Sequence, residues 1–381
     1  MTYPLPPFSD LVAIPKSKFA AFVASLTGRQ ARKTGRKRAQ AGTHARTTVC
    51  LFEGSAKAVS KSGIGQAMRH QRECLELNGH HWTSSVWDRY DVLQLNTVLP
   101  DSPLAAFVAR LRGKKIVYYA HSTKEDFRNS FKGSNLFAPF FKMWITWCYN
   151  RGDLIVTPTP YSASILSSYG LFPPVRVLSN GVDTRFFSPS TPARSRFRRR
   201  YGIAEGVPVA ISAGHMIERK GVEDFVELAK AMPWAQFFWF GYTDPRFVPE
   251  KVRKAVQSAP KNLHFPGFVE HSHLRDAYCG ADAFVFCSRE ETEGIVMLEA
   301  LACGLPVVVR DIPVYSGWLK DGENAYIVPG LTEMTERCSQ VLRGVIPGIA
   351  EVARRGREVA CNRDLGNVAG QLTEIYEDLD S

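Results

Sequence analysis

Two glutamates, Glu291 and Glu299, lie on either side of a predicted helix start at Gly294. The first turn of a helix has unpaired backbone N–H groups and the positive end of the helix dipole, so it attracts phosphate. Gly294 has no Cβ and lets a ligand approach the backbone closely. The carboxylates can then accept hydrogen bonds from sugar hydroxyls, one at each end of a bound sugar nucleotide. Acidic side chains near a helix start can also simply complement the dipole, and that alternative stays open for either glutamate.

A predicted strand, helix and strand within residues 281–310 would position these carboxylates. Residues 283–287 and 306–309 are short apolar runs, which are typical of buried parallel strands. The intervening helix is predicted from about residue 294 to residue 303. Apolar residues at helical spacing give it one side to bury: Ile295, Leu298, Leu301 and Ala302.

The same segment resembles the donor-site signature of the family 4 retaining glycosyltransferases, E-G-F-G-x-x-x-x-E-A-x-A-x-G-x-P-V. The chain keeps Glu291, Gly294 and Glu299, followed by A-L-A-C-G-L-P-V over residues 300–307. It departs from the signature at Thr292-Glu293, where most members have Gly-Phe. The segment E-E-T-E-G-I-V, residues 290–296, is similar to the corresponding segment of the branch that glycosylates diacylglycerol lipids.

The resemblance implies the GT-B fold, an α/β architecture of two doubly wound Rossmann-like domains that face each other across a cleft. Alternating predicted strands and helices on both sides of residues 184–206 favour two parallel sheets with right-handed crossovers. Residues 184–206 themselves, rich in proline and arginine, are predicted to be a linker. The expected parts are a basic, partly disordered extension (1–46), an acceptor domain (47–186), a nucleotide-sugar domain (187–365) and a helix that returns to the first domain (366–381).

The resemblance also implies which residues bind the donor. Arg219-Lys220 resembles the family's basic pair on the diphosphate, where cations stabilise the charge of the leaving group. His215 stands where many relatives have Arg. Gly63-Ile64-Gly65-Gln66 is similar to a family loop at the cleft, and Met68 argues against a hydride-transfer dinucleotide site. The expected donor-binding residues are Gly63, Gly65, Gly214, Arg219, Lys220, Glu291, Gly294, Ile295, Val296 and Glu299.

His121, at the end of a predicted strand, resembles the family's histidine near the transferred sugar. A role in positioning and charge stabilisation is expected for it, with a purely structural role as the alternative. The expected catalytic residues are His121, Glu291, Arg219 and Lys220, and the secondary, acceptor-side residues are Asp126, Lys132 and Asn180. No D-x-D motif lies in a predicted strand-end loop, so we expect neither a metal nor a cofactor besides the nucleotide sugar.

Composition is ordinary for a globular protein of two domains. The chain has 381 residues, of which 45% are hydrophobic and 22% charged. Its eight cysteines form no C-x-x-C pair and several fall in apolar runs, which favours reduced thiols in a cytoplasm. No apolar run reaches the roughly eighteen residues that a membrane span needs.

The net charge of +11 is concentrated at one end. Residues 1–46 contain many Lys and Arg and only one acid, Asp10, and residues 17–26 predict a short amphipathic helix. Such a segment can bind anionic lipid or nucleic acid, or be merely solvated. Residues 136–149 are rich in aromatic side chains and predict either a core helix or a helix at a bilayer interface.

The resemblance implies a retaining hexosyltransferase, and with the charge pattern it predicts an enzyme peripheral on the cytoplasmic face of the plasma membrane. It would use UDP-glucose or UDP-galactose and an acceptor such as glucosyl-diacylglycerol. The expected partners are the UDP-hexose, the glycolipid and an anionic membrane surface, with no nucleic acid. The alternatives are a soluble or polyprenyl-linked cell-envelope acceptor, an epimerase of the same fold, or a non-enzymatic membrane or nucleic-acid adaptor with a vestigial nucleotide pocket.

Overall fold

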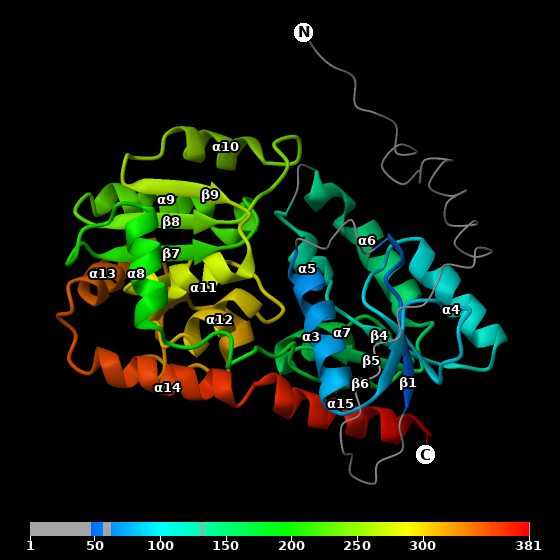
Figure 1. Cartoon of the computed structure of the whole chain (residues 1–381). Coiled ribbons are helices and arrows are strands. Elements are labelled where there is room, and N and C mark those ends of the chain that lie inside the picture. Colours follow the sequence, from blue (N-terminus) through cyan, green and yellow to red (C-terminus); the bar gives the residue numbers. More distant parts are fainter. Residues whose placement is uncertain (1–46, 56–61, 131–132, 381) are drawn as a thin grey trace.

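The computed structural model describes residues 47–55, 62–130 and 133–380, which form two α/β domains side by side (Figure 1). Each domain is built on a six-stranded sheet in which neighbouring strands run parallel. The predicted α/β class with two doubly wound domains is therefore confirmed. The basic extension, its predicted helix and Lys132 lie outside the described residues.

The N-terminal domain has the strand order β2-β1-β3-β4-β5-β6. Its strands are β1 (Thr48–Leu51), β2 (His81–Thr83), β3 (Val92–Leu95), β4 (Lys115–Tyr119), β5 (Leu154–Thr157) and β6 (Val175–Val177). Its helices are α3 (Gly63–Leu77), α4 (Asp101–Leu111), α5 (Lys124–Phe127), α6 (Ser134–Tyr149) and α7 (Pro160–Ser167). The central strands β3 and β5 are buried along their whole length, because helices cover both faces of a parallel sheet.

The C-terminal domain has the order β12-β11-β10-β7-β8-β9. Its strands are β7 (Val209–Ala213), β8 (Gln236–Phe240), β9 (Leu263–Gly267), β10 (Ala283–Phe286), β11 (Val307–Arg310) and β12 (Tyr326–Val328). Its helices are α8 (Thr191–Arg200), α9 (Val222–Ala231), α10 (Glu250–Gln257), α11 (His271–Gly280), α12 (Ile295–Ala302), α13 (Leu331–Leu342) and α14 (Ile349–Cys361). Two short 3-10 helices, η2 (Glu218–Lys220) and η3 (Pro313–Tyr315), lie in strand-end loops.

The predicted strand–helix–strand unit forms the middle of this domain. β10 pairs with β11, with Phe284 opposite Val307, and with β7 on its other side. Side chains alternate across a strand, so Phe284 and Phe286 enter one core cluster and Val285 the other. Leu298 of α12 packs in the cluster that contains Phe286. This packing fixes the start of α12 at the carboxyl end of β10.

The prediction of a linker over residues 184–206 is wrong for its middle part. Thr191–Arg200 form helix α8, whose first turn is capped by the Ser190 hydroxyl. Phe197 is buried in the core, and Arg196 forms a two-point contact with Asp276 of α11 at 2.8 and 2.7 Å. Gly63 and Gly65 also differ from expectation, since they lie in the first turn of α3 and not in a loop before it.

The chain passes between the domains at two adjacent places. The Val182 N–H donates to the Arg363 carbonyl at 3.0 Å, and the Leu365 N–H donates to the Val182 carbonyl at 3.2 Å. After the second crossing, α15 (Leu365–Asp380) packs along α3 of the N-terminal domain, and Figure 1 shows it continuing the line of α14. The return helix begins at Leu365, one residue before the segment 366–381 for which it was predicted.

Candidate active site

Glu291 lies in the loop of residues 288–294, between β10 and α12, and is almost fully buried. Its Oε1 accepts hydrogen bonds from Lys220 Nζ at 2.5 Å and from Ser288 Oγ at 2.5 Å. Burial alone would raise the pKa of Glu291, but Lys220, Arg219 and these hydrogen bonds hold the pKa below its ordinary value. Glu291 is therefore a carboxylate at neutral pH, ready to accept hydrogen bonds from a ligand.

Lys220 reaches Glu291 because η2 packs tightly against the end of β10. Gly221, at φ 72°, follows η2, and a Cβ there would collide with the backbone carbonyl of Cys287. The Lys220 ammonium also lies 5.4 Å from the centre of the Phe286 ring. Lys220 and Glu291, which the sequence predicted separately as donor-binding residues, thus form an ion pair in the loops that follow β7 and β10.

Arg219 contacts the other domain. Its guanidinium Nη1 lies 2.7 Å from Asp126 Oδ1, and its Nε donates to Ser130 Oγ at 3.2 Å. Its backbone N–H donates to the Asn129 carbonyl at 3.1 Å. Nη1 also donates to the Glu290 carbonyl at 2.6 Å. The predicted diphosphate-binding Arg219 and the predicted acceptor-side Asp126 therefore meet at the domain boundary.

The predicted phosphate site lies at the start of α12. Gly294 is the N-cap residue at φ 93°, and no side chain caps the helix. Ile295 and Val296, both predicted donor contacts, form its first turn. Gly214, at the end of β7, adjoins the alkyl part of Lys220. The Met297 N–H donates to the Gly294 carbonyl at 2.9 Å, which leaves the N–H groups of Ile295 and Val296 to donate hydrogen bonds to an anion.

Glu299, one turn further into α12, has a different environment. It is buried, and its Oε2 accepts a hydrogen bond from the Tyr278 hydroxyl of α11 at 3.0 Å. Burial raises the pKa of Glu299 to about 8, and the Tyr278 hydroxyl and the more distant Arg69 of α3 oppose this rise only in part. Sequence analysis did not identify Tyr278, which could be found only by knowing how α11 and α12 pack.

His121 lies at the end of β4 and is buried. Its Nε2 is 2.9 Å from Asn96 Oδ1, and its ring stacks on Tyr119. Burial lowers the pKa of His121 to about 4, so the ring is neutral at physiological pH and supplies no cation. Among the described residues, the His121 side chain makes no recorded hydrogen bond to Glu291 or Lys220, so its predicted role at the sugar stays a prediction.

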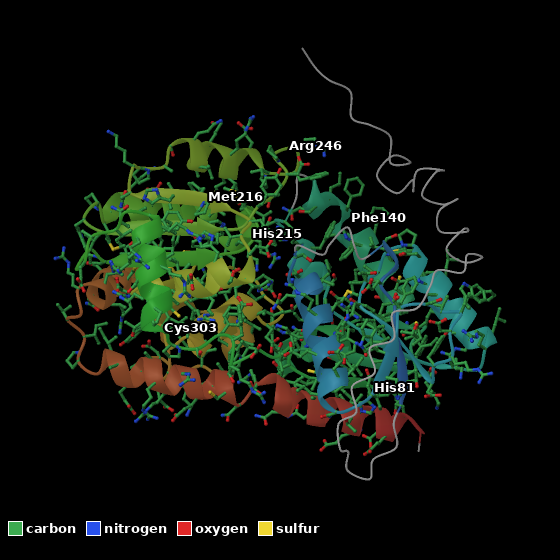
Figure 2. All side chains as sticks on the ribbon, in the orientation of Figure 1. His81, Phe140, His215, Met216, Arg246 and Cys303 are labelled. Atoms are coloured by element: carbon green, nitrogen blue, oxygen red, sulfur yellow. The ribbon has the colours of Figure 1, made fainter. Side chains whose placement is uncertain are left out.

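His215 lies at the end of β7, and Figure 2 shows it at the edge of the C-terminal domain that faces the other domain. Its Nδ1 is 3.0 Å from the Tyr242 carbonyl. Burial lowers the pKa of His215, and Lys220 and Arg219 lower it further. His215 therefore does not replace the arginine of other family members as a permanent cation.

Asn180 and Glu293 form a second contact between the domains. Glu293 Oε2 accepts from the Asn180 backbone N–H at 2.9 Å and from Asn180 Nδ2 at 2.8 Å. The sequence analysis placed Asn180 on the acceptor side but gave Glu293 no role. The signal was present, because Glu293 is one of the two positions where the chain departs from the family signature.

Gly63 lies at the start of α3, whose first turn has no side-chain cap. Among the residues that the structure describes, a Cβ at Gly63 would meet no atom within 4 Å. Within the part of the chain that the structure describes, no group of three His, Cys, Asp or Glu side chains is arranged to hold a metal ion.

Two family matches divide the chain as the domains do. Residues 75–186 match the family described as Glycosyltransferase Family 4, and residues 193–343 match Glycosyl transferases group 1. Among curated proteins, the chain is 34% identical over 333 residues to a processive diacylglycerol alpha-glucosyltransferase of Acholeplasma laidlawii, covering 87% of this chain and 98% of that one. It is 28% identical to an alpha-galactosylglucosyldiacylglycerol synthase of Streptococcus pneumoniae, covering 65% of this chain and 66% of that one.

Solved structures share the fold at low sequence identity. HepE of Anabaena, in complex with UDP and glucose, is 17% identical, with a TM-score of 0.68 over 87% of this chain and 100% of that one. Sucrose-phosphate synthase of Thermosynechococcus elongatus is 18% identical, with a TM-score of 0.64 over 82% of this chain and 77% of that one. These similarities support the two-domain architecture described above.

Proposed function

This chain belongs to the family 4 glycosyltransferases, and on that premise we propose that it transfers glucose or galactose from a UDP-sugar to a glucosyl-diacylglycerol. Membership of this family shows that the chain is a hexosyltransferase. The similarity to curated glycosyl-diacylglycerol synthases supports a role in glycolipid synthesis. The donor nucleotide, the hexose and the acceptor are the proposed parts. One observation carries the sugar-nucleotide donor: an uncapped helix start between two buried glutamates, with Lys220 beside the first of them. The lipid acceptor is proposed from the similarity to the glycosyl-diacylglycerol synthases.

The donor is proposed to lie across the start of α12. Its diphosphate would accept hydrogen bonds from the first-turn N–H groups and from Lys220, which together stabilise the charge that develops on the leaving UDP. The charged Glu291 would accept from hexose hydroxyls. The neutral Glu299, which forms no ion pair among the described residues, would bind ribose hydroxyls. Retention of the anomeric configuration follows from the family resemblance.

An anionic membrane surface is the proposed partner of α4 and α6. α6 exposes Leu136, Phe140, Met143 and Trp147, which are spaced along one side of the helix. α4 exposes Leu104, Phe107 and Leu111 in the same way. Both helices bury their other sides in one core cluster, and the Trp144 indole of α6 donates to the Val98 carbonyl before α4 at 2.7 Å. Figure 2 shows Phe140 at the outer edge of this domain.

Positively charged side chains support a surface contact at these helices. The Arg151 guanidinium lies over the Trp147 ring at 3.7 Å, and Lys142 lies on the same helix as Phe140. Among the described residues, no helix is long and apolar enough to cross a bilayer. Aromatic side chains with flanking cations suit the interface of an anionic membrane. The basic residues of the 1–46 extension would add to that attraction.

A panel of radiolabelled nucleotide sugars tests the reaction. UDP-glucose, UDP-galactose and GDP-mannose are incubated with diacylglycerol, glucosyl-diacylglycerol and polyprenyl phosphate, and the products are separated by chromatography. We expect label in a diglycosylated lipid with a UDP-hexose. Label in the polyprenyl fraction supports the cell-envelope alternative instead, and absence of both transfer and donor hydrolysis supports the non-enzymatic adaptor.

Vesicle flotation tests the membrane partner. Met143→Asp and Leu111→Asp place charges at sites that are 69% and 73% exposed, so they leave the fold intact but oppose insertion. Burying one such side chain gains about 1.5–3 kcal/mol, so the double variant should lose at least tenfold in affinity for phosphatidylglycerol vesicles. Val345→Asp, at an exposed site of the C-terminal domain, is the matched control. Equal binding by the wild type, the double variant and the Val345→Asp control at low salt would contradict the proposed surface.

A further inference from the structure

The loop of residues 288–294 is bonded to the N-terminal domain on both sides of Glu291. Before it, Glu290 Oε1 accepts from the Tyr161 hydroxyl of α7 at 2.9 Å. After it, the Thr292 carbonyl accepts from Thr159 Oγ1 at 2.8 Å. Glu293 then accepts from Ser179 and Asn180, which follow β6. The loop that carries Glu291 is therefore held by a domain to which it does not belong.

Glu293 accepts more of these hydrogen bonds than any other residue of the loop, and it is only 1% exposed. Its Oε1 accepts from Ser179 Oγ at 2.5 Å, and its Oε2 accepts from the backbone and the side chain of Asn180. Among the described residues it forms no ion pair, and Arg363 acts on it only at longer range. A buried carboxylate without an ion pair is expensive to keep, whereas an apolar side chain could fill the same volume. Glu293 stands where the family signature has an apolar Phe, which points to a role beyond packing.

The partners of Glu293 are themselves fixed. Asn180 and Gly181 immediately precede Val182, whose N–H and carbonyl bond the returning chain at Arg363 and Leu365. Gly181 lies at φ 73°, and a Cβ there would be 2.7 Å from the Leu365 side chain. Ser179 and Asn180 are therefore expected to move together with the segment where the chain crosses between the domains. A change in the angle between the domains would move them relative to α12.

We propose that Glu293 is a positioning residue that holds Glu291 and the start of α12 in register with the N-terminal domain, so that the hexose site is complete only when the domains are correctly placed. This inference rests on the proposed donor arrangement. It predicts that Glu293 affects binding of the hexose and its transfer. The nucleotide pocket around Glu299, on the far side of the helix start, should not depend on it.

Two substitutions of Glu293 separate this role from simple packing. In Glu293→Gln, the amide oxygen can accept both Asn180 hydrogen bonds while the amide NH₂ donates to the Ser179 hydroxyl, so all three contacts survive. Glu293→Ala loses all three. Thr184→Val is the matched control, because it removes a 2.6 Å hydrogen bond to Asp364 at the same crossing without touching the 288–294 loop.

Calorimetric binding of UDP and of UDP-glucose, with kcat measured beside it, tests the proposal. We expect Glu293→Ala to weaken UDP-glucose about tenfold and to lower kcat about as much, with UDP affinity changed less than about twofold. Glu293→Gln and Thr184→Val should stay near the wild type, and circular dichroism should show all the variants folded. Equal loss of UDP and UDP-glucose in Glu293→Ala, an equal effect of Thr184→Val, or a Gln variant as poor as the Ala variant would each overturn the proposal.

The wild-type protein separates the failure of this inference from the failure of the proposed function. If it binds another nucleoside diphosphate sugar and not UDP-glucose, the UDP assignment is wrong. The same variants are then compared for their binding of that sugar nucleotide and of its free nucleoside diphosphate. If it binds no nucleotide sugar at all, the proposed function and the positioning role are both overturned.

Discussion

The two ends of the candidate donor site carry the same side chain in opposite electrostatic environments. Around Glu291, before α12, lie Lys220, Ser288 and Arg219, and they hold the pKa of this glutamate below its usual value. Around Glu299, inside α12, burial raises the pKa to about 8 with one tyrosine hydroxyl as its hydrogen-bond partner. At neutral pH the first is ionised and the second is largely protonated.

This difference shows that sequence spacing places two carboxyl groups but does not decide their chemistry. The state of each is set by its surroundings: Lys220 and Arg219 at η2 lower the pKa of Glu291, whereas burial raises the pKa of Glu299 although Tyr278 of α11 opposes the rise. A charged acceptor beside cations suits the reacting sugar, where charge develops during transfer. A neutral carboxyl suits the nucleoside, which undergoes no chemistry. Substitution of each glutamate tests whether Glu291 acts on the reacting hexose and Glu299 on the nucleoside.

The largest effect is expected for Glu291→Ala. Loss of hydrogen bonds to a charged group costs about 1.5–3 kcal/mol, so kcat should fall by about ten- to a hundredfold. The variant also leaves Lys220 buried without its partner. Initial rates of transfer from UDP-glucose at saturating donor measure this. Glu227→Ala, in an exposed ion pair of the same domain, is the control, and similar rates for both variants would refute the assignment.

A smaller effect is expected for Glu299→Ala. A hydrogen bond between neutral groups contributes about 0.5–1.5 kcal/mol, so the Kd for UDP should rise about two- to tenfold while kcat at saturating donor changes little. Calorimetry with UDP measures the change. Tyr278→Phe, which keeps the carboxyl and removes only its partner, should weaken UDP less. A kcat loss in Glu299→Ala as large as in Glu291→Ala would remove the distinction between the two ends.

The raised pKa of Glu299 predicts a pH-dependent stability. Between the ordinary carboxyl value of 4.5 and about 8, the folded protein binds a proton that the unfolded chain does not. The free energy of unfolding therefore falls as pH rises through that window, by up to about 1.4 kcal/mol per pH unit. Glu299→Gln cannot ionise and should gain Tm relative to the wild type between pH 5 and pH 8. A constant difference in Tm would show that Glu299 ionises normally in the folded protein.

The smallest effect is expected for removal of metal ions. The sequence has no D-x-D motif in a strand-end loop, and Lys220 with the start of α12 can neutralise the diphosphate. Transfer in detergent micelles should therefore continue at the same rate in excess EDTA. Complete loss of activity, restored by magnesium or manganese, would mean that a cation replaces Lys220 in this role.

Sequence analysis predicted those parts of the molecule that depend on local pattern. The β10–α12–β11 unit was predicted because uninterrupted apolar runs and a glycine boundary are local signals. Helix α8 was not predicted because Phe197, its buried aromatic residue, lies within a run of arginines. A run of this kind is typical of a solvated linker. The contact of Arg219 with Asp126 could not be predicted, because it depends on how the two domains meet. For the same reason the partners of Glu290 and Glu293 appear only in the structure.

A crystal structure with an intact, slowly transferred donor such as UDP-2-fluoro-glucose tests the central claim most directly. The distances from each glutamate to the nearest ligand hydroxyl are the measurement. The account predicts a hexose hydroxyl within hydrogen-bond distance of Glu291, about 2.7–3.2 Å, a ribose hydroxyl equally close to Glu299, and the diphosphate on the first turn of α12. A donor bound in the reverse direction, with its ribose at Glu291, or one that contacts neither carboxyl group, would contradict it.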